Sequence, residues 1–558
     1  MGVYEFGPFT RGLWLNPPPD LIPVEALRRS KGTHGLPTGS VRSRNGSTLL
    51  YSVSAHSLFR FIDVRFQGVG TVLNRNDVAG RTGLDGTRLA FAPMQTAEGQ
   101  GDLLYVAGGG DLFKVNSTGG HFAWGIPSVG APTLAVISGG ALNGTYKYRQ
   151  TYVNLATSVA RGNSTGEASI SPVNQKVVVT VAAAPADSDA SSIEIWRTKA
   201  GGTVFFRLNG AGHAFGAAVE ENIADSALES AELPTDNGVP DDTFEDCFGP
   251  HQGRMWWARV NEAGKRGRVI FSPIGRPESQ GGGFIQLAAD DDKTQKLMGF
   301  GGSLFCFSEF AIHEIISETV PFRFARVHGS PGTTLPHTVT WTPFGIFYIA
   351  QDGPRLFDGV TSRPAGQDQL GALWRGEGRG IPDATGAFEG VVATWARGEW
   401  FIGDVDRCYA FNPIIESWRE VGVGVSSLYW EPDSDKLIAG LSSGKVVILE
   451  DEATFDDAGS RIEFEIETKT ISLPGQLLFV QRFEIDTDTS LEDLTVSAVL
   501  DNGVVDLGTI RTGPRSTVEV PVMLAARRFA VRIRGSLLRQ VHINHIRVFA
   551  RETTSGLA

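Results

Sequence analysis

A short hairpin pattern recurs seven times along the chain and limits what the chain can fold into. Each copy has an apolar stretch of four to six residues, a turn of Gly, Asp, Ser or Asn, and a second apolar stretch. The copies are 45–63, 101–116, 251–273, 301–315, 344–359, 398–418 and 434–450. Apolar stretches of this length, bounded by turn residues, are typical of β-strands and are too short for helices. The pattern therefore predicts an all-β chain.

The spacing of the copies favours one all-β architecture. Apart from one large gap, they start about 36 to 56 residues apart, which is the repeat length of four-stranded propeller blades. Weaker strand candidates between them, 284–287 and 390–395, would supply the outer strands. The 68 Gly and 28 Pro among 558 residues fit a chain with many turns. We predict a six- or seven-bladed β-propeller, with an array of sandwiches or barrels as the alternative that hairpins alone leave open.

The large gap, between 116 and 251, predicts a separate inserted domain. On a strand at 143–154, Tyr146, Tyr148 and Tyr152 would share one face, and Lys147 and Arg149 the other. Several more short strands with polar turns follow within about 80 residues. This pattern is typical of a small immunoglobulin- or fibronectin-III-like β-sandwich.

Five segments describe the expected organisation. They are an N-terminal arm (1–44), the propeller's first part (45–119), the inserted sandwich with an acidic linker (120–235), the propeller's second part (236–455) and a C-terminal β region (456–558). Within 217–246 there are ten acidic residues and no Lys or Arg. We interpret that stretch as a solvated linker. Cation binding is the alternative, although the regular oxygen-ligand spacing of an EF-hand is missing.

The C-terminal region carries an alternating pattern of its own. Phe529, Val531 and Ile533 alternate with Arg528, Arg532 and Arg534, so one strand face is apolar and the other cationic. The parity of the apolar residues shifts within 541–548, which predicts a β-bulge near Asn544 and His545. The three arginines form either a solvated face or an interface with an acidic neighbouring subunit.

The sequence offers no motif for catalysis, and we predict no catalytic, cofactor-binding or metal-binding residue and no enzyme activity. It contains no phosphate-binding Gly-rich loop with Lys-Ser/Thr, no Gly-x-Ser-x-Gly elbow and no His-Glu-x-x-His helix. A glycosidase carboxylate pair would leave little trace in a propeller sequence, since its members come from different blades. We interpret Asp290–Asp292 as a charge cluster in a loop.

The net charge, the cysteines and the N-terminus limit the binding partners and the compartment that we expect for the protein. A net charge of −12 makes the chain a poor general binder of nucleic acid. Cys247, Cys306 and Cys408 each lie in or beside an apolar stretch, which indicates buried thiols in a chain made in a reducing compartment. The N-terminus has no basic and apolar leader, and no run of eighteen apolar residues occurs. We therefore expect neither a secretion signal nor a membrane span.

Three stretches resemble one group of phage proteins. In 250–279, PHQGRMWWARVNEAGKRGRVIFSPIGRPES, an Arg-hydrophobic-aromatic strand, a polar loop and an Arg-Val-hydrophobic-aromatic-Ser strand precede a Pro-Glu turn. The second stretch has Tyr-x-Tyr-x-x-Thr-Tyr-Val at 146–153 and Ile-Glu-Ile-Trp-Arg-Thr at 193–198. The third is the Leu-x-Pro at 21–23. In their order along the chain, the motifs are similar to those of tail nozzle (tubular tail) proteins of short-tailed bacteriophages. Where that family has Gly-Gly-Leu-Asn near its N-terminus, this chain has RGLWLN at 11–16.

The resemblance implies a structural virion protein, made in the cytoplasm of a bacterial host, that conducts DNA during ejection. It implies a homo-hexameric ring in contact with phage adaptor and portal proteins and tail fibres, with no specific DNA binding. In such a conduit we expect Asp352, Asp358, Asp404 and Asp406 to line the channel, since cations would hold the phosphates. We expect Arg528, Arg532 and Arg534 to face a neighbouring subunit. Alternatives are a tail-tip propeller that binds the host surface, and a propeller glycan hydrolase.

Overall fold

The computed structural model describes residues 2–15, 18–36, 38–95, 102–155, 160–208, 212–240, 244–260, 262–287, 292–316, 321–374, 390–473, 476–488, 491–514 and 516–554. Within these ranges the chain is built of strands and turns, with one α-helix, α1 (Gln367–Trp374), and three short 3-10 helices. The predicted all-β class is confirmed. No helix among the described residues is long and apolar enough to span a membrane.

The chain forms two compact units. Unit 1 contains residues 1–60, 65–70 and 327–558, and unit 2 contains residues 61–64 and 71–326. Outside residues 133–221, three four-stranded antiparallel sheets lie wholly in unit 2, and three four-stranded groups lie wholly in unit 1.

These three sheets of unit 2 keep the order of the chain, each strand pairing with the next. They are β11 (Leu89–Gln95), β12 (Asp102–Gly108), β13 (Phe113–Asn116) and β14 (His121–Ala123); β22 (Phe244–His251), β23 (Arg254–Val260), β24 (Arg268–Phe271) and β25 (Gly283–Gln286); and β26 (Thr294–Phe300), β27 (Ser303–Ser308), β28 (Ile312–Ile316) and β29 (Arg323–Arg326).

Two groups in unit 1 keep the order of the chain, and the third is completed from far away. In that third group the strand order is β38-β39-β40-β6, so a strand near the N-terminus pairs with β40. The groups are β30 (Thr340–Thr342), β31 (Gly345–Ala350), β32 (Gly353–Phe357) and β33 (Ser362–Pro364); β34 (Val392–Ala396), β35 (Glu399–Gly403), β36 (Cys408–Asn412) and β37 (Ser417–Glu420); and β38 (Val425–Glu431), β39 (Lys436–Leu441), β40 (Lys445–Asp451) and β6 (Gly46–Tyr51).

Six of the seven predicted hairpins are confirmed, and each supplies the two middle strands of a sheet. They are β12–β13, β23–β24, β27–β28, β31–β32, β35–β36 and β39–β40. The hairpin predicted at 45–63 is wrong. Its first half is β6, which pairs with β40, and its second half is β7 (Ser57–Phe61), which belongs to another sheet. Without β6, the sheet of β38, β39 and β40 would lack a fourth strand. The long-range pairing of β6 with β40 is therefore favoured over a local hairpin within 45–63.

The hydrophobic cores lie between consecutive sheets. In unit 2 the first strands β11, β22 and β26 contact one another in sequence, and in unit 1 β30, β34 and β38 do the same. Trp257 and Tyr105 share one such core, Trp256 and Leu304 a second, and Trp400 with Phe347 a third. Cys247, Cys306 and Cys408 are buried in these cores, as predicted, and are free thiols.

The segment of the predicted insert forms two sheets around a core of its own within unit 2. One sheet has the order β15-β18-β21 and the other β17-β16-β19-β20. Tyr146, Tyr148 and Tyr152 of β16 are buried in this core, whereas Lys147 and Arg149 pair with Glu167 on the opposite face. The predicted division of faces is confirmed. The strands are β15 (Thr133–Asn143), β16 (Tyr146–Val153), β17 (Ala168–Ile170), β18 (Val173–Thr180), β19 (Ser192–Thr198), β20 (Phe205–Arg207) and β21 (Ala218–Glu221).

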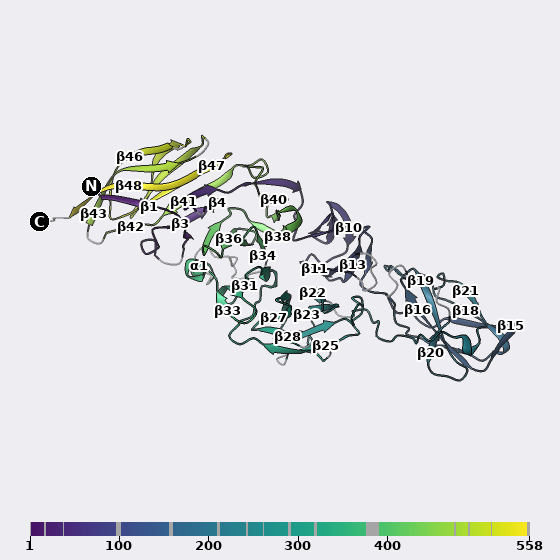
Figure 1. The fold of residues 1–558 in the computed structure, drawn as a ribbon. Coiled ribbons are helices and arrows are strands. Elements are labelled where there is room, and N and C mark those ends of the chain that lie inside the picture. Colours follow the sequence, from purple (N-terminus) through teal and green to yellow (C-terminus); the bar gives the residue numbers. More distant parts are fainter. Residues whose placement is uncertain are drawn as a thin grey trace. The chain divides into compact units, whose positions relative to one another are not determined.

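The C-terminal region forms two sheets together with the N-terminal residues of the chain (Figure 1). In one sheet β1 (Gly2–Phe6) and β5 (Val41–Ser43) pair with β48 (His542–Thr554), which is followed by β43 (Gln476–Thr487) and β46 (Ser516–Ala526). The first and last strands of the described chain, β1 and β48, therefore pair directly with each other.

The second sheet continues from β37 through β2 and β3 into the C-terminal strands, and the two sheets enclose the largest core of unit 1. Between β43 and β48 the register shifts so that Asn544 has no partner, which confirms the predicted bulge. The remaining strands are β2 (Gly12–Leu13), β3 (Ala26–Lys31), β4 (Thr33–Gly35), β41 (Ile462–Thr468), β42 (Ile471–Ser472), β44 (Asp493–Leu500), β45 (Gly503–Arg511) and β47 (Arg528–Leu537).

Burial in these cores predicts that two tryptophans of unit 1 differ strongly in how much they stabilise the folded state. Trp400 is fully buried and stacks on Phe347 at 5.1 Å, whereas Trp341 is 52% exposed. We expect Trp400→Ala to lower the free energy of unfolding by about 3–5 kcal/mol, through lost burial and a residual cavity. Trp341→Ala is the control and should change it by about 0.5 kcal/mol or less. Denaturant unfolding measures both, and equal losses would contradict the location of the core.

Candidate functional site

Arg419 is the centre of a cluster of buried charges in unit 1. Its Nε and Nη2 donate hydrogen bonds to Glu399 at 3.1 and 2.5 Å. Its Nη1 and Nη2 donate to Glu450 at 2.6 and 2.8 Å. Each carboxylate oxygen of the two glutamates therefore accepts a hydrogen bond from one guanidinium. Such bidentate, charge-assisted pairs are the strongest hydrogen bonds in proteins.

The partners of Arg419 come from three parts of the sequence. Arg419 is on β37, Glu399 begins β35 and Glu450 lies near the end of β40. Arg419 Nη1 also donates to the backbone oxygen of Thr33 in β4, at 3.0 Å. The cluster thus joins two neighbouring sheets and the N-terminal segment at one point.

Arg44 is the centre of a second buried junction in unit 1. It is 1% exposed and donates from Nε to the oxygen of Val421 at 2.6 Å and from Nη1 to Asp457 Oδ1 at 2.9 Å. Its Nη2 donates to the other carboxylate oxygen, Asp457 Oδ2, and Ser47 Oγ donates to Asp457 Oδ1 at 2.9 Å. Arg44 therefore anchors the chain just before β6 to the segment that follows β40.

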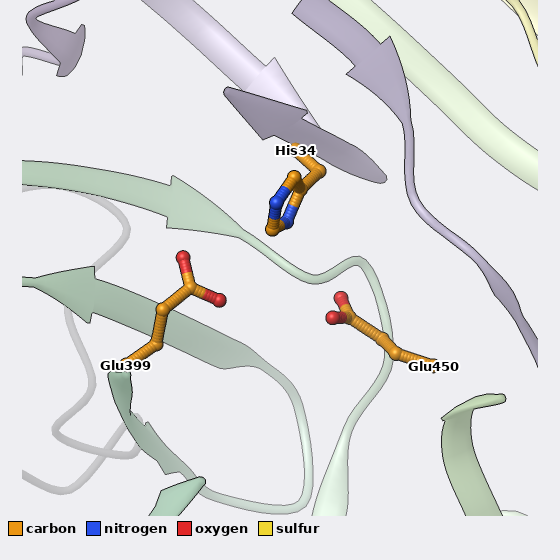
Figure 2. A group of neighbouring side chains, drawn as sticks. All are labelled: His34, Glu399 and Glu450. Carbon is orange, nitrogen blue, oxygen red and sulfur yellow. The ribbon is translucent and has the colours of Figure 1, made fainter. Parts of the chain in front are cut away.

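His34 completes a group that could be read as a metal site. The ligand atoms of His34, Glu399 and Glu450 lie within 4.8 Å of one another, and Figure 2 shows His34 facing the two carboxyl groups. One imidazole and two carboxylates are a chemically suitable set for zinc. Each of the four carboxylate oxygens, however, already accepts a hydrogen bond from Arg419, so an ion would compete with the guanidinium for its ligands. The geometry is that of an ion-pair network.

Electrostatics in this cluster agree with ion pairing. Burial lowers the pKa of His34, and the charge of Arg419 lowers it further, which favours the neutral imidazole. Burial alone would raise the pKa of Glu450, but the charge and hydrogen bonds of Arg419 bring it well below its usual range.

Unit 2 contains buried ion pairs of the same kind. Lys114 is fully buried and donates to Glu278 at 2.5 Å, and its Nζ lies 2.8 Å from Asp189. Arg197, also fully buried, pairs with Glu221 at 2.6 Å and with Asp225 at 2.7 Å. In both clusters one cation is shared by two carboxylates, as at Arg419.

The predicted channel acids occupy turns of two sheets in unit 1. Asp352 lies in the β31–β32 turn, where Arg355 Nη2 bonds it at 2.5 Å. Asp404 and Asp406 lie in the equivalent β35–β36 turn, and Asp358 follows β32 at the opposite end of its sheet. Asp404 is buried, accepts hydrogen bonds from the backbone of Asp406 and Arg407, and has a pKa raised by burial. Asp352, Asp358 and Asp406 are exposed.

The three predicted interface arginines lie on one face of β47 and differ in their partners. Arg532 is half-buried and pairs with Glu467 at 2.7 Å and with Glu465 at 3.5 Å on β41. Arg534 reaches Asp506 at 3.5 Å, and Arg528 is exposed. Phe529, Val531 and Ile533 are fully buried on the other face. Arg532 is thus bound within its own subunit, whereas Arg528 and Arg534 are exposed.

The acidic stretch 217–246 is not the solvated linker that we predicted. Glu220 and Glu221 belong to β21, where Glu221 is buried against Arg197. Farther along, Glu229 pairs with Arg207, Asp236 with Arg276 and Asp246 with Lys296. These acids neutralise cations that lie elsewhere in the sequence, which a local charge count does not reveal. Asp241, Asp242, Asp290 and Asp291 lie outside the described residues.

Comparisons with known proteins identify no family. No protein-family model and no curated protein matches the chain. Among solved structures, the computationally designed protein Ika8 covers 73% of this chain and 99% of its own, at 12% identity and a TM-score of 0.31. An exo-β-1,3-galactanase from Phanerochaete chrysosporium covers 82% and 95%, at 9% identity and 0.17. PorZ of the Porphyromonas gingivalis type-IX secretion system covers 89% and 86%, at 9% identity and 0.20. Likeness this weak carries no argument about function.

Removing the central cation should destabilise unit 1. Arg419→Met leaves two buried carboxylates without a partner, and we expect the free energy of unfolding to fall by about 3–5 kcal/mol. The triple variant Arg419→Met, Glu399→Leu, Glu450→Leu should recover much of this loss because it buries no charge. Arg363→Met, at an exposed position of β33, is the control. A triple variant as unstable as the single one would show that unpaired charge is not the cause.

Acid should weaken the same cluster. The folded pKa of Glu450 is below the unfolded value of about 4.3, so its stabilising effect is complete at neutral pH and is lost as pH falls below that value. In a His34→Gln background, which removes the titration of that imidazole, we expect the stability gap between Glu450 and Glu450→Gln to shrink from pH 6 to about pH 3. Denaturant unfolding at each pH measures the gap. A constant gap would contradict the ionised pair.

Proposed function

We propose that the protein is a structural component of a bacteriophage tail, a β-propeller that forms part of the nozzle through which DNA leaves. The ordered resemblance of 250–279, 146–153, 193–198 and 21–23 to tail nozzle proteins carries this proposal. The four-stranded sheets, packed through their first strands, support the propeller. The pairing of β6 with β40 supports it further, since a strand from the other end of the chain can close a ring of blades.

We infer the number of blades from the strands. Six four-stranded groups outside residues 133–221, three in each unit, would be six blades. β7, β8 (Val64–Val69), β9 (Val72–Arg75) and β10 (Val78–Thr82) supply four more strands of similar length, enough for a seventh. The two sheets at 133–221 would be a β-sandwich inserted between two blades, and the paired C-terminal sheets a second sandwich beside the propeller.

This architecture refines where the acids would lie. Blades surround a central channel, and the first strand of each blade would be nearest to it. Turns lie at the two ends of a sheet. Asp352 and Asp406 would therefore surround one mouth of the channel and Asp358 the other, whereas Asp404 is buried in its own turn and would not line it. Exposed acids at the mouths repel the phosphate backbone, so DNA would pass without being held.

A closed ring of identical subunits is the expected assembly, since lateral contacts between copies are satisfied by cyclic symmetry. We expect sixfold rings with a pore in negative-stain images of the purified protein. Arg528→Glu should reduce ring formation if β47 faces an acidic neighbour, whereas Arg363→Glu, exposed on β33, should not. Light scattering that shows only monomers, both alone and with adaptor rings of the same phage, would contradict the nozzle. Trimers would favour a host-binding tail tip.

A further inference from the structure

One lysine of unit 2 is completely enclosed and lies between two carboxyl groups. Lys114 is fully buried, and no other lysine among the described residues is buried to this extent. Its Nζ lies 2.5 Å from Glu278 Oε1 and 2.8 Å from Asp189 Oδ2. Lysine is almost never fully buried unless it is paired, and its ammonium group is strongly hydrated in water. The contacts pair the charge, and they also bring an amine close to two carboxyl carbons.

The three groups come from three separate parts of the chain. Lys114 is in β13, Asp189 is in the loop between β18 and β19, and Glu278 is in the turn between β24 and β25. A bond between Lys114 and Asp189 would therefore join the sheet β11–β14 to the two sheets of residues 133–221.

Each of the two carboxyl groups has one oxygen that is bound and one that is not. Asp189 Oδ2 accepts from Asn154 Nδ2 at 3.0 Å, in addition to its contact with Lys114. Glu278 Oε1 accepts from Tyr105 Oη at 3.2 Å. The other oxygens, Asp189 Oδ1 and Glu278 Oε2, are buried without a hydrogen-bond partner. A buried polar atom without a partner is unfavourable, so the loss of Asp189 Oδ1 as water would relieve the structure.

Aromatic rings exclude water from these groups. Tyr105 is the cross-strand partner of Lys114, so both side chains lie on the same face of the sheet. The rings of Trp124 and Tyr105 lie 4.8 Å apart between centroids, and Trp124 Nε1 donates to the backbone oxygen of Pro277, the residue before Glu278. Tyr105 is fully buried and Trp124 nearly so. Exclusion of water favours a condensation that releases water over the reverse hydrolysis.

The loop that carries Asp189 is held in place by further contacts. Two residues earlier, Asp187 Oδ1 accepts from Arg81 Nη1 at 2.8 Å, and the backbone oxygen of Asp187 accepts from the N–H of Ala123 at 3.0 Å. Because Lys114 Nζ is 2.8 Å from Asp189 Oδ2, the carboxyl carbon lies at most one C–O bond farther away. Groups fixed in such contact react as if they were present at very high concentration.

Burial also provides a group that can carry protons. Burial raises the pKa of Glu278, the charge of Lys114 lowers it and that of Asp189 raises it, and the net direction is upward. Burial lowers the pKa of Lys114, but the two carboxylates raise it more, so the resting amine is charged. Transfer of one proton from Lys114 to Glu278 replaces two buried charges by two neutral groups. The neutral amine is then a nucleophile.

We propose that Lys114 and Asp189 form an intramolecular isopeptide bond, with Glu278 as the acid–base catalyst. The neutral Nζ attacks Cγ of Asp189 while Glu278 gives its proton to Asp189 Oδ1. Asn154 stabilises the negative charge that develops on Oδ2. Glu278 then removes a second proton from Nζ and passes it to Oδ1, the Cγ–Oδ1 bond breaks, and water leaves. An ammonium and a carboxylate have become an amide and one water, Glu278 is unchanged, and no oxidant or other reactant is needed.

Such a bond would hold two parts of unit 2 together after their noncovalent contacts are broken. It closes a loop of the chain between residues 114 and 189, which lowers the entropy of the unfolded state as a disulfide does. Unlike a disulfide, an amide persists in a reducing compartment. The inference does not rest on the nozzle proposal, since all reacting groups lie within one subunit.

Mass spectrometry of the purified full-length protein tests the proposal. We expect the intact mass to be lower than the sequence mass by one water molecule, and a tryptic digest to contain a branched peptide that joins Lys114 to Asp189. Glu278→Gln keeps both reacting groups but loses the proton carrier, so it should retain the full mass. Asp189→Asn should lose ammonia in place of water, because its leaving group is the amide nitrogen.

The matched control is a lysine that is paired but not enclosed. Lys296 lies 2.5 Å from Asp246, yet its side chain is 21% exposed. Lys296→Met should therefore lose one water molecule as the wild type does, and no branched peptide should join Lys296 to Asp246.

Three results would overturn the proposal. The first is wild-type protein at its full sequence mass without a branched peptide, which would leave Lys114 as the centre of an ion pair only. The second is a loss of water that persists in Lys114→Met. The third is complete linkage in Glu278→Gln. The wild-type mass needs no variant, so a variant that fails to fold does not affect it. Monomers in solution, which would contradict the nozzle, would leave each of these results unchanged.

Discussion

The pairing of Arg419 with Glu399 and Glu450 is the contact on which the organisation of unit 1 depends. It joins β35, β37 and β40, and through Thr33 it reaches the N-terminal segment. Arg44 repeats the arrangement between the residues before β6 and those after β40. Both junctions lie where sequence-distant segments must meet in one register. Removal of either would leave charges buried without partners, which disfavours any other pairing of these strands.

Buried ion pairs of this kind contribute more to specificity than to net stability. Transfer of three charged groups from water costs about as much as their mutual attraction returns. An apolar core of equal volume would hold the same segments at least as firmly, but it would accept several registers. The guanidinium of Arg419 accepts only one arrangement of four carboxylate oxygens. We therefore interpret the clusters at Arg419, Arg197 and Lys114 as devices that select one arrangement of strands.

Local patterns in the sequence were sufficient to predict most hairpins, several buried strand faces and one bulge. Turn residues between apolar stretches identified six hairpins, and alternation placed Tyr148 and Phe529 in cores. A shift of parity located the bulge at Asn544. Each of these depends on residues within one or two strands. The sequence failed at 45–63, where the true partner of β6 is almost four hundred residues away, and at 217–246, whose acids pair with distant cations.

The clusters at Arg419 and Lys114 escaped prediction for the same reason. A charged residue inside an apolar stretch, such as Arg419 after Trp418, looks like the solvent-facing position of an alternating strand. Its burial is decided by a neighbouring sheet and by β4, which the local sequence does not specify. Lys114 likewise lies inside an apolar stretch of β13, and only the approach of Asp189 and Glu278 encloses its amine.

The pairing of β6 with β40 affects the order in which the chain can fold. β6 is made early in synthesis, but β40 and Asp457 are made some four hundred residues later. Until then β6 exposes an unpaired edge and Arg44 has no carboxylate partner. Contacts of such high sequence separation form slowly, because the entropy of closing a long loop must be offset first. Sheets with local hairpins, such as β30–β33, can form before that event. We therefore expect the docking of β6 on β40 to come late, and the ion pair of Arg44 with Asp457 to form only when that docking has the correct register.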